Sequence, residues 1–181
     1  MKTLTDKHSM IDFQSLSKNY EVRLLTESDS QDVLQLYNTN PYFFKHCPPE
    51  PTLASVRRDM TKLPPNIKPE NKYFLGYFDN AKLIAVLDLV EGYPDLHTAF
   101  IGLFMLDREY QSRGIASRLM TEALFQLMKN FDRVRLGYVA TNEVAVHFWT
   151  KQGFVPTGET SKTDYYEIIL ADFLGDKKDK E

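Results

Sequence analysis

The chain has 181 residues, of which 43% are hydrophobic and 26% are charged, which fits a globular domain with its own core and excludes a disordered or fibrous polymer. Its 22 basic and 25 acidic residues give a net charge of −3, without the basic excess that binding to nucleic acid requires. The single cysteine excludes an internal disulfide, and the four histidines lack metal-ligand spacing. No apolar run approaches the roughly 20 residues of a membrane span, and the polar start does not resemble a signal peptide. We therefore expect a cytoplasmic protein with no metal, nucleic acid or membrane among its partners.

The first part of the chain predicts one strand followed by two helices. Residues 20–24 alternate between apolar and polar side chains, as in a half-buried strand. Residues 28–31 form a capping-box pattern, after which apolar residues recur at helical spacing until Pro41. Thr52 is expected to cap a second helix, which ends before the prolines at 64–65.

The middle of the chain predicts three antiparallel strands and then a βαβ unit. Residues 72–79, 83–90 and 98–106 are aromatic and β-branched, with turn residues between them. The third segment is apolar nearly throughout, which predicts a central strand covered on both faces. Residues 115–127 carry the apolar stripe of a helix of about 16 residues. Residues 133–138 alternate again, so we expect this strand to lie parallel to the central one.

The last elements are a helix and two closing strands. Residues 143–152 are expected to form a helix with Gly153 as its C-terminal cap. Residues 154–155 and 165–170 then predict the strands that complete the sheet.

No linker or repeat divides the chain, so the sequence predicts one α/β domain with a mixed sheet. We place this domain at residues 20–174, after an N-terminal extension of residues 1–19. Residues 175–181 form a charged tail.

The loop between the predicted central strand and its helix is the best candidate for a binding site. It consists of Gln111, Ser112, Arg113, Gly114, Ile115 and Ala116. Amide groups at a helix start lack internal partners and, with the helix dipole, favour an anion such as a pyrophosphate. Gly114 and Ala116 would allow a close approach, and Arg113 can add a charge-assisted contact. Taken alone, a polar loop with one glycine before a helix is more often an ordinary connection, and this one matches neither the P-loop nor the dinucleotide fingerprint.

Two stretches together resemble the GNAT superfamily of N-acetyltransferases. Residues 103–120 resemble its acetyl-coenzyme A binding motif, in which a strand and then Gln/Arg-x-x-Gly-x-Gly/Ala open the cofactor helix. A second stretch is similar to the next motif of the family, N-x-x-A-x-x-F-Y-x-x-x-G-F, at five of its six specified positions. The residues at the six positions are Asn142, Ala145, Phe148, Trp149, Gly153 and Phe154, of which Trp149 differs from the pattern. The resemblance covers about residues 20–170.

The resemblance implies a mostly antiparallel sheet of about six to seven strands, flanked by helices, with a splayed parallel strand pair that opens a cleft. It implies acetyl-coenzyme A as co-substrate and no metal. The pantetheine arm would pair with backbone groups of Phe104 and Leu106, and the strand would be irregular near Gly102. Asn142 would hydrogen-bond the pantetheine, and Phe148 would lie against the cofactor or simply pack in the core. The pyrophosphate would be held by the amides of Gln111, Ser112, Arg113, Gly114, Ile115 and Ala116, together with Ser117.

Trp149 departs from the family pattern, since a tyrosine that protonates the leaving thiolate often stands at this position. The indole N–H does not titrate and cannot act as this acid. Either another group serves, or the thiolate leaves unassisted, which its pKa near 8.5 allows.

A general base is needed to deprotonate an ammonium acceptor. Our candidate is Glu91, because it ends a predicted strand beside the central one, at the edge where the cleft is expected to open. Asp88 is the alternative, and Glu91 could also be a solvated carboxylate at the start of a turn. Tyr93, Tyr165 and Tyr166 could line the acceptor pocket, supply a hydroxyl or pack on the sheet.

The resemblance therefore predicts acetyl transfer to a primary amine of a small molecule or peptide, by direct attack in a ternary complex. The alternative is a non-catalytic acyl-coenzyme A sensor or scaffold. Residues 29–63 would form one wall of the acceptor site, and their aromatic residues favour a small molecule. These residues are Tyr42, Phe43, Phe44 and His46. Cys47 has no visible partner, and the oligomeric state is open between a monomer and a homodimer.

Overall fold

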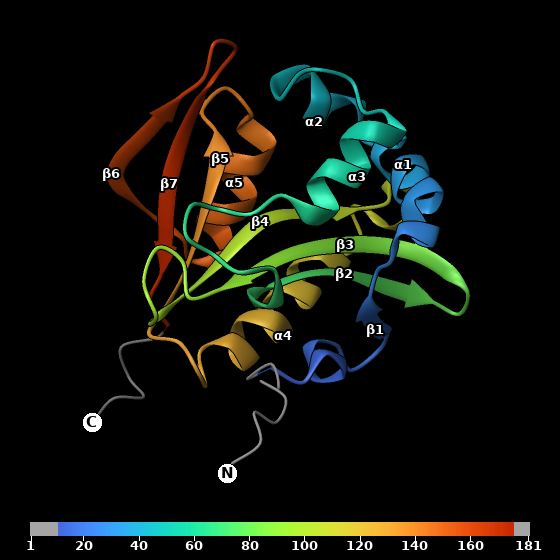
Figure 1. Cartoon of the computed structure of the whole chain (residues 1–181), viewed down its shortest axis with the longest axis horizontal. Helices are drawn as coiled ribbons and strands as arrows, with labels where there is room; N and C mark the ends of the chain where they lie inside the picture. The colour runs from blue at the N-terminus through green and yellow to red at the C-terminus, as the bar shows by residue number, and fades with distance from the viewer. Residues whose placement is uncertain (1–10, 176–181) are drawn as a thin grey trace.

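The computed structural model describes residues 11–175 and contains one seven-stranded sheet with helices on both sides (Figure 1). The strands are β1 (Glu21–Leu24), β2 (Lys72–Asp79), β3 (Lys82–Glu91), β4 (Thr98–Leu106), β5 (Arg133–Val139), β6 (Val155–Lys162) and β7 (Glu167–Phe173). The helices are α1 (Ser30–Asn38), α2 (Pro41–His46), α3 (Leu53–Thr61), α4 (Ile115–Leu127) and α5 (Glu143–Gln152). Four 3-10 turns join them: η1 (Phe13–Leu16), η2 (Glu27–Asp29), η3 (Pro69–Asn71) and η4 (Arg108–Tyr110).

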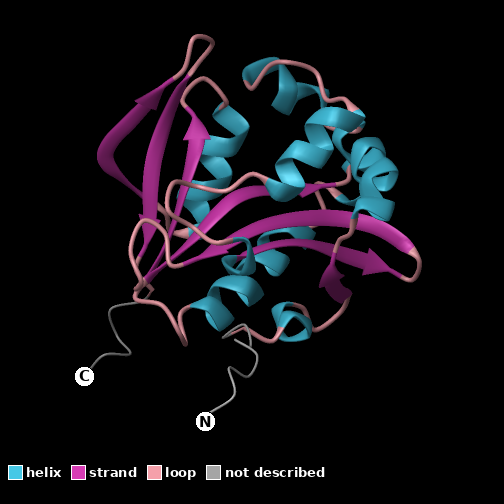
Figure 2. Ribbon diagram, viewed as in Figure 1, coloured by secondary structure: helices cyan, strands magenta, loops and turns pink. Residues whose placement is uncertain are grey.

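The strands follow the order β1-β2-β3-β4-β5-β7-β6, and β4 and β5 form the parallel pair. Figure 2 shows the helices distributed over the two faces of this sheet. The predicted mixed α/β sheet, the three consecutive antiparallel strands and the βαβ unit are all confirmed. Among the described residues, no helix is long and apolar enough to cross a membrane.

Side chains along the central strands point alternately to the two faces of the sheet, and apolar side chains on both faces form the two layers of the core. On one face, Leu87, Leu89 and Ile101 pack against the apolar stripe of α4. On the other face, Val86 and Met105 pack against α1 and α3. The buried residues of the α4 stripe are Ile115, Leu119, Met120, Ala123, Leu124 and Leu127. This stripe confirms the prediction, although the helix has 13 residues rather than about 16.

The helix ends match the sequence signals in part. The Thr52 side chain accepts a hydrogen bond from Ser55 N at 3.1 Å, which confirms it as a cap, and Gly153 ends α5 in the left-handed conformation. The capping box expected at 28–31 is wrong. A 3-10 turn precedes α1, so the box forms two residues earlier, and Asp29 Oδ2 accepts from Thr26 N at 2.8 Å.

Helix α2 was not expected, because Pro41 was interpreted as a helix breaker. Proline lacks the amide that a first-turn residue leaves unbonded in any case, so it can start a helix as well as end one. Here Pro41 is the first residue of α2.

The central strand β4 is irregular where this was predicted. Asp88 of β3 pairs with Leu103, whereas the next residue, Leu89, pairs with Ile101. Gly102 is therefore the extra residue of a β-bulge. The parallel pairing with β5 covers only Thr98 to Ile101, after which the two strands diverge (Figure 1).

The segment before β1 contributes to the core. Ile11 and Leu16 are buried in the same cluster as α4, and η1 contacts that helix. The division of the chain at residue 20 stays a prediction. Residues 1–10 of the expected extension and residues 176–181 of the expected tail lie outside the described residues.

Candidate functional site

The second half of β4 has a free backbone edge. In an antiparallel pair the backbone groups of successive residues point alternately toward and away from the partner strand. Asp107 N donates to Ile84 O of β3 at 2.7 Å, so the backbone groups of Phe104 and Leu106 point away from β3. Within residues 11–175, no strand pairs with this side of β4 beyond Ile101. This edge can accept an extended ligand as an additional strand.

Side chains partly occupy the end of that edge. The Leu106 carbonyl accepts hydrogen bonds from Gln111 Nε2 at 2.8 Å and from Asn40 Nδ2 at 3.1 Å. Gln111 Nε2 also donates to Asn40 Oδ1 at 2.8 Å. Within residues 11–175, the Leu106 amide and both backbone groups of Phe104 therefore lie on the side of β4 that no strand covers. Sequence reasoning missed Asn40, because no local pattern links it to β4.

The start of α4 is arranged to receive an anion. Gly114 is the N-cap in a left-handed conformation with φ of 75°, and a Cβ at this position would meet no atom within 4 Å. The first backbone bond of the helix runs from Arg118 N to Gly114 O at 3.1 Å. The amides of Ile115, Ala116 and Ser117 precede this bond, so they carry the positive end of the helix dipole. An open approach and these amides together fit a pyrophosphate.

Two further predicted ligand residues also have structural partners. Ser117 Oγ accepts from Gln152 Nε2 at 2.9 Å, which links α4 to α5. Asn142 is buried, and its Oδ1 caps α5 by accepting from Ala145 N at 3.0 Å. The NH2 group of Asn142 is thus the part of the side chain that a ligand can use.

An aromatic cluster connects α5 to the diverging part of β4. Phe104 stacks on Phe148 with ring centroids 6.2 Å apart, and Phe148 meets Trp149 edge-on at 4.8 Å. Trp149 is only 8% exposed and also contacts Phe154. Phe148 is half-buried against the core, so its packing is clear, and a contact with the cofactor stays a prediction. His147 is exposed, as its position beside Phe148 on the helix predicted.

Two contacts join α2 to the far half of the sheet. His46 Nδ1 lies 2.8 Å from Thr141 Oγ1, just beyond the end of β5. The Cys47 thiol lies beside the hydroxyl of Tyr166, which precedes β7. Burial raises the pKa of Cys47, and the neighbouring Cys47, with burial, raises the pKa of Tyr166 to about 12. The expectation that Cys47 has no partner is therefore wrong.

The predicted position of Glu91 is also wrong. Because β3 runs antiparallel to β4, the last residue of β3 lies beside the first residues of β4, and Glu91 pairs with Ala99. At that point β4 is still paired with β5. Phe104 lies five residues further along β4, a distance of roughly 17 Å. Glu91 is 8% exposed, and its Oε2 lies 3.5 Å from the Tyr73 hydroxyl, so it is not a solvated turn residue either.

Asp88, the alternative, lies where β4 opens. It pairs with Leu103, directly beside the bulge at Gly102. Its Oδ2 accepts from Lys72 Nζ at 3.0 Å, whereas its buried Oδ1 has no hydrogen-bond partner within the part of the chain that the structure describes. Burial raises the pKa of Asp88, and Lys72 opposes this shift.

Comparison with known proteins identifies the family. A family model described as the acetyltransferase (GNAT) family matches residues 30–154. The chain belongs to this family. The comparison with curated proteins gives no match.

Solved structures of GNAT proteins have the same fold. An acetyltransferase from Thermus thermophilus is 20% identical, with a TM-score of 0.69 over 86% of this chain and 96% of that chain. A Salmonella typhimurium acetyltransferase that modifies the N-terminal serine of ribosomal protein L7/L12 is 17% identical, with a TM-score of 0.67 over 89% and 98%. The PaiA N-acetyltransferase of Thermoplasma acidophilum, in complex with coenzyme A, is 19% identical, with a TM-score of 0.60 over 85% and 99%.

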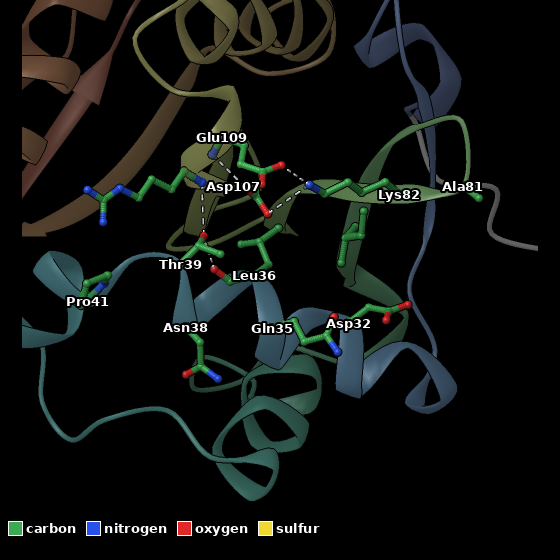
Figure 3. Close-up of a pocket in the computed structure, with 12 residues that line it drawn as sticks. Asp32, Gln35, Leu36, Asn38, Thr39, Pro41, Ala81, Lys82, Asp107 and Glu109 are labelled. Carbon is green, nitrogen blue, oxygen red and sulfur yellow. Dashed lines mark hydrogen bonds and ion pairs between the residues drawn. The ribbon is translucent and has the colours of Figure 1, made fainter.

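A separate cavity of about 770 Å³ lies outside the predicted GNAT site. It is bounded by α1, by the start of β3 and by the residues that follow β4. Lys82 reaches Glu109 at 2.7 Å and Asp107 at 4.0 Å, and Arg108 N donates to Thr39 Oγ1 at 3.2 Å (Figure 3). None of the predicted cofactor or catalytic residues lines this cavity.

Proposed function

We propose that this GNAT protein transfers an acetyl group from acetyl-coenzyme A to a primary amine, by direct attack in a ternary complex. The observation that carries the proposal is the continuity between two binding features of one segment. The free edge of β4 at Phe104 leads within ten residues to the N-terminus of α4 at Gly114. One ligand with an extended arm and a pyrophosphate would use both features.

Different residues would bind different parts of the cofactor. Backbone groups of Phe104 and the Leu106 amide would bind the pantetheine arm, and the NH2 group of Asn142 would donate to the same arm. Phe148 would cover it. The pyrophosphate would lie against the amides of Gln111, Ser112, Arg113, Gly114, Ile115 and Ala116, with Ser117 at the edge.

The chemistry needs a neutral amine held against the thioester carbonyl, and positioning alone supplies several kcal/mol of the barrier reduction. The leaving thiolate has an ordinary pKa near 8.5, so it can depart without a dedicated acid. This suits Trp149, which is buried among aromatic rings and carries no titrating group.

We propose a small-molecule amine as the favoured acceptor. The contacts of His46 with Thr141 and of Cys47 with Tyr166 join α2 to the far half of the sheet. Such contacts would limit the room for a long peptide beside the diverging strands. The aromatic residues predicted for this wall support a small acceptor in part. Tyr42 contacts His46 with its ring tilted, whereas Phe43 and Phe44 pack against the core between α1, α3 and the sheet. A peptide N-terminus is the competing acceptor, because the Salmonella neighbour modifies a protein N-terminal serine.

A screen of coenzyme A release across polyamines, amino acids, aminoglycosides and short peptides tests the proposal. We expect turnover with at least one small amine, and turnover with peptides alone would correct the acceptor class. The second candidate, a non-catalytic acyl-coenzyme A sensor or scaffold, is favoured by Trp149. It predicts that acetyl-coenzyme A raises the melting temperature while every acceptor leaves coenzyme A release at the background rate.

A further inference from the structure

We infer that Asp88 takes the proton from the acceptor ammonium, that Gly102 makes room for its carboxylate at the bulge of β4, and that the ion pair with Lys72 holds this carboxylate there. The inference rests on the proposed function and assigns its proton acceptor.

The Asp88 carboxylate occupies space that is free because Gly102 has no side chain. A Cβ built on Gly102 would lie 2.5 Å from Asp88 Oδ2 and 3.0 Å from Asp88 Cγ. Any side chain at Gly102 would therefore displace the carboxylate. Asp88 of β3 thus occupies the position that a side chain of the central strand would otherwise take.

The carboxylate lies at the point where β4 leaves β5. Parallel pairing ends at Ile101, one residue before Gly102. The Asp88 side chain is 13% exposed, whereas Gly102 is exposed, so the bulge is the side from which an acceptor can approach. Glu91, three residues further along β3, has no such opening beside it.

The charges around Asp88 come from β2 and from α3 with the residues after it. Lys72 of β2 bonds to Oδ2, and Lys62, just after α3, also favours the ionised form. Asp59 of α3 opposes it, although Asp59 accepts a hydrogen bond from Tyr37 at 3.1 Å. On β4, the facing residues Gly102 and Leu103 carry no charge. Lys72 is therefore the cation in direct contact with Asp88, and it opposes the rise in pKa that burial causes.

The two carboxylate oxygens differ in their surroundings. Oδ1 is buried and has no hydrogen-bond partner among residues 11–175, whereas Oδ2 accepts from Lys72 and faces Gly102 at the bulge. An ammonium proton passes to Oδ2, and the nitrogen lone pair that is freed forms a C–N bond to the acetyl carbonyl carbon. The C–S bond then breaks, its electron pair leaves on sulfur, and the second proton released from nitrogen goes to this thiolate.

The experiment measures coenzyme A release against pH, with the melting shift by acetyl-coenzyme A as the binding control. We expect Asp88→Asn to lower kcat/KM by about 10² to 10⁴-fold, the usual contribution of a general base, with the melting shift retained. The double variant Lys72→Met with Asp88→Asn leaves no unpaired buried charge and should show the same loss if the single variant folds poorly.

Two variants test the supporting residues. Lys72→Met should move the acidic limb of the rate profile to higher pH, because the carboxylate loses its cation, while the rate on the alkaline side stays within about tenfold. Gly102→Ala should lower kcat more than it changes KM, because it displaces the carboxylate. Glu91→Gln is the matched control and should keep the wild-type profile.

Wild-type rates in both Asp88→Asn and the double variant, or an unmoved acidic limb in Lys72→Met, would overturn the inference alone. Absence of coenzyme A release by the wild-type protein with every acceptor would remove the proposed function and, with it, this inference.

Discussion

Replacement of Gly114 by valine should abolish acetyl-coenzyme A binding and leave the fold intact. A β-branched residue at φ of 75° strains the backbone by about 2 kcal/mol. No neighbour lies within 4 Å of the new Cβ, so no steric clash with the protein adds to this cost. The branched side chain would instead project into the space through which a pyrophosphate approaches the α4 amides.

The assay is thermal unfolding with and without the ligand. At about 100 times its dissociation constant, a ligand stabilises the wild-type fold by roughly 2.7 kcal/mol. For a chain of this size that raises the melting temperature by roughly 5 to 11 °C. In Gly114→Val the unliganded protein should melt about 4 to 8 °C lower, and the ligand-dependent rise should vanish.

Gly158 offers a matched control. It lies in β6, away from the predicted site, with φ of 87°, and a Cβ there also meets no atom within 4 Å. Gly158→Val should therefore lose similar stability while keeping the full ligand-dependent rise. A full rise in Gly114→Val would refute the assignment of the loop, and a lost rise in Gly158→Val would show that strain anywhere suffices.

Three further predictions test individual side chains. Trp149→Phe should keep the transfer rate within about tenfold, a barrier change below roughly 1.4 kcal/mol, because the indole only packs; a loss of several hundredfold with intact cofactor binding would contradict this. Glu91→Gln should likewise stay within about tenfold of wild type in kcat/KM, since Glu91 lies at the paired end of β4. The hydrogen bond from Arg23 lowers the pKa of Asp29. The pair therefore stabilises the fold at any pH above the ordinary carboxyl pKa, and this stabilisation is lost as the pH falls through the lowered pKa. Asp29→Asn should thus cost no more than about 1 kcal/mol at pH 7, because Arg23 is 42% exposed, and less at pH 3; an equal cost in urea unfolding at both values would argue against it.

Local patterns predicted the elements because their causes are local. The stripe of α4 recurs every three to four residues, and its residues are buried as this period requires. Gly153 ends α5 because a left-handed residue is needed there and glycine adopts it without strain. The bulge near Gly102 was predicted through the resemblance and not from the glycine itself.

These local patterns did not predict which residues of neighbouring strands pair with one another. Glu91 and Asp88 lie three residues apart on one predicted strand, and nothing local shows which of them faces the diverging part of β4. That choice depends on the antiparallel pairing of β3 with β4 and on the four residue pairs that join β4 to β5. The pairing places Glu91 at the closed end and Asp88 at the open one.

The contrast between local patterns and long-range contacts also explains why the sequence predicts a cofactor and does not predict the acceptor. Most of the proposed cofactor residues lie between Phe104 and Ser117, so one continuous segment carries both the strand edge and the helix start. The acceptor side is built from contacts between distant segments, as in His46 with Thr141, 95 residues apart, and Cys47 with Tyr166. No motif spans such pairs, and their geometry depends on how α2 packs over the sheet. Acceptor specificity in this chain should therefore change through substitutions in α2 and before β7 that leave every cofactor residue untouched.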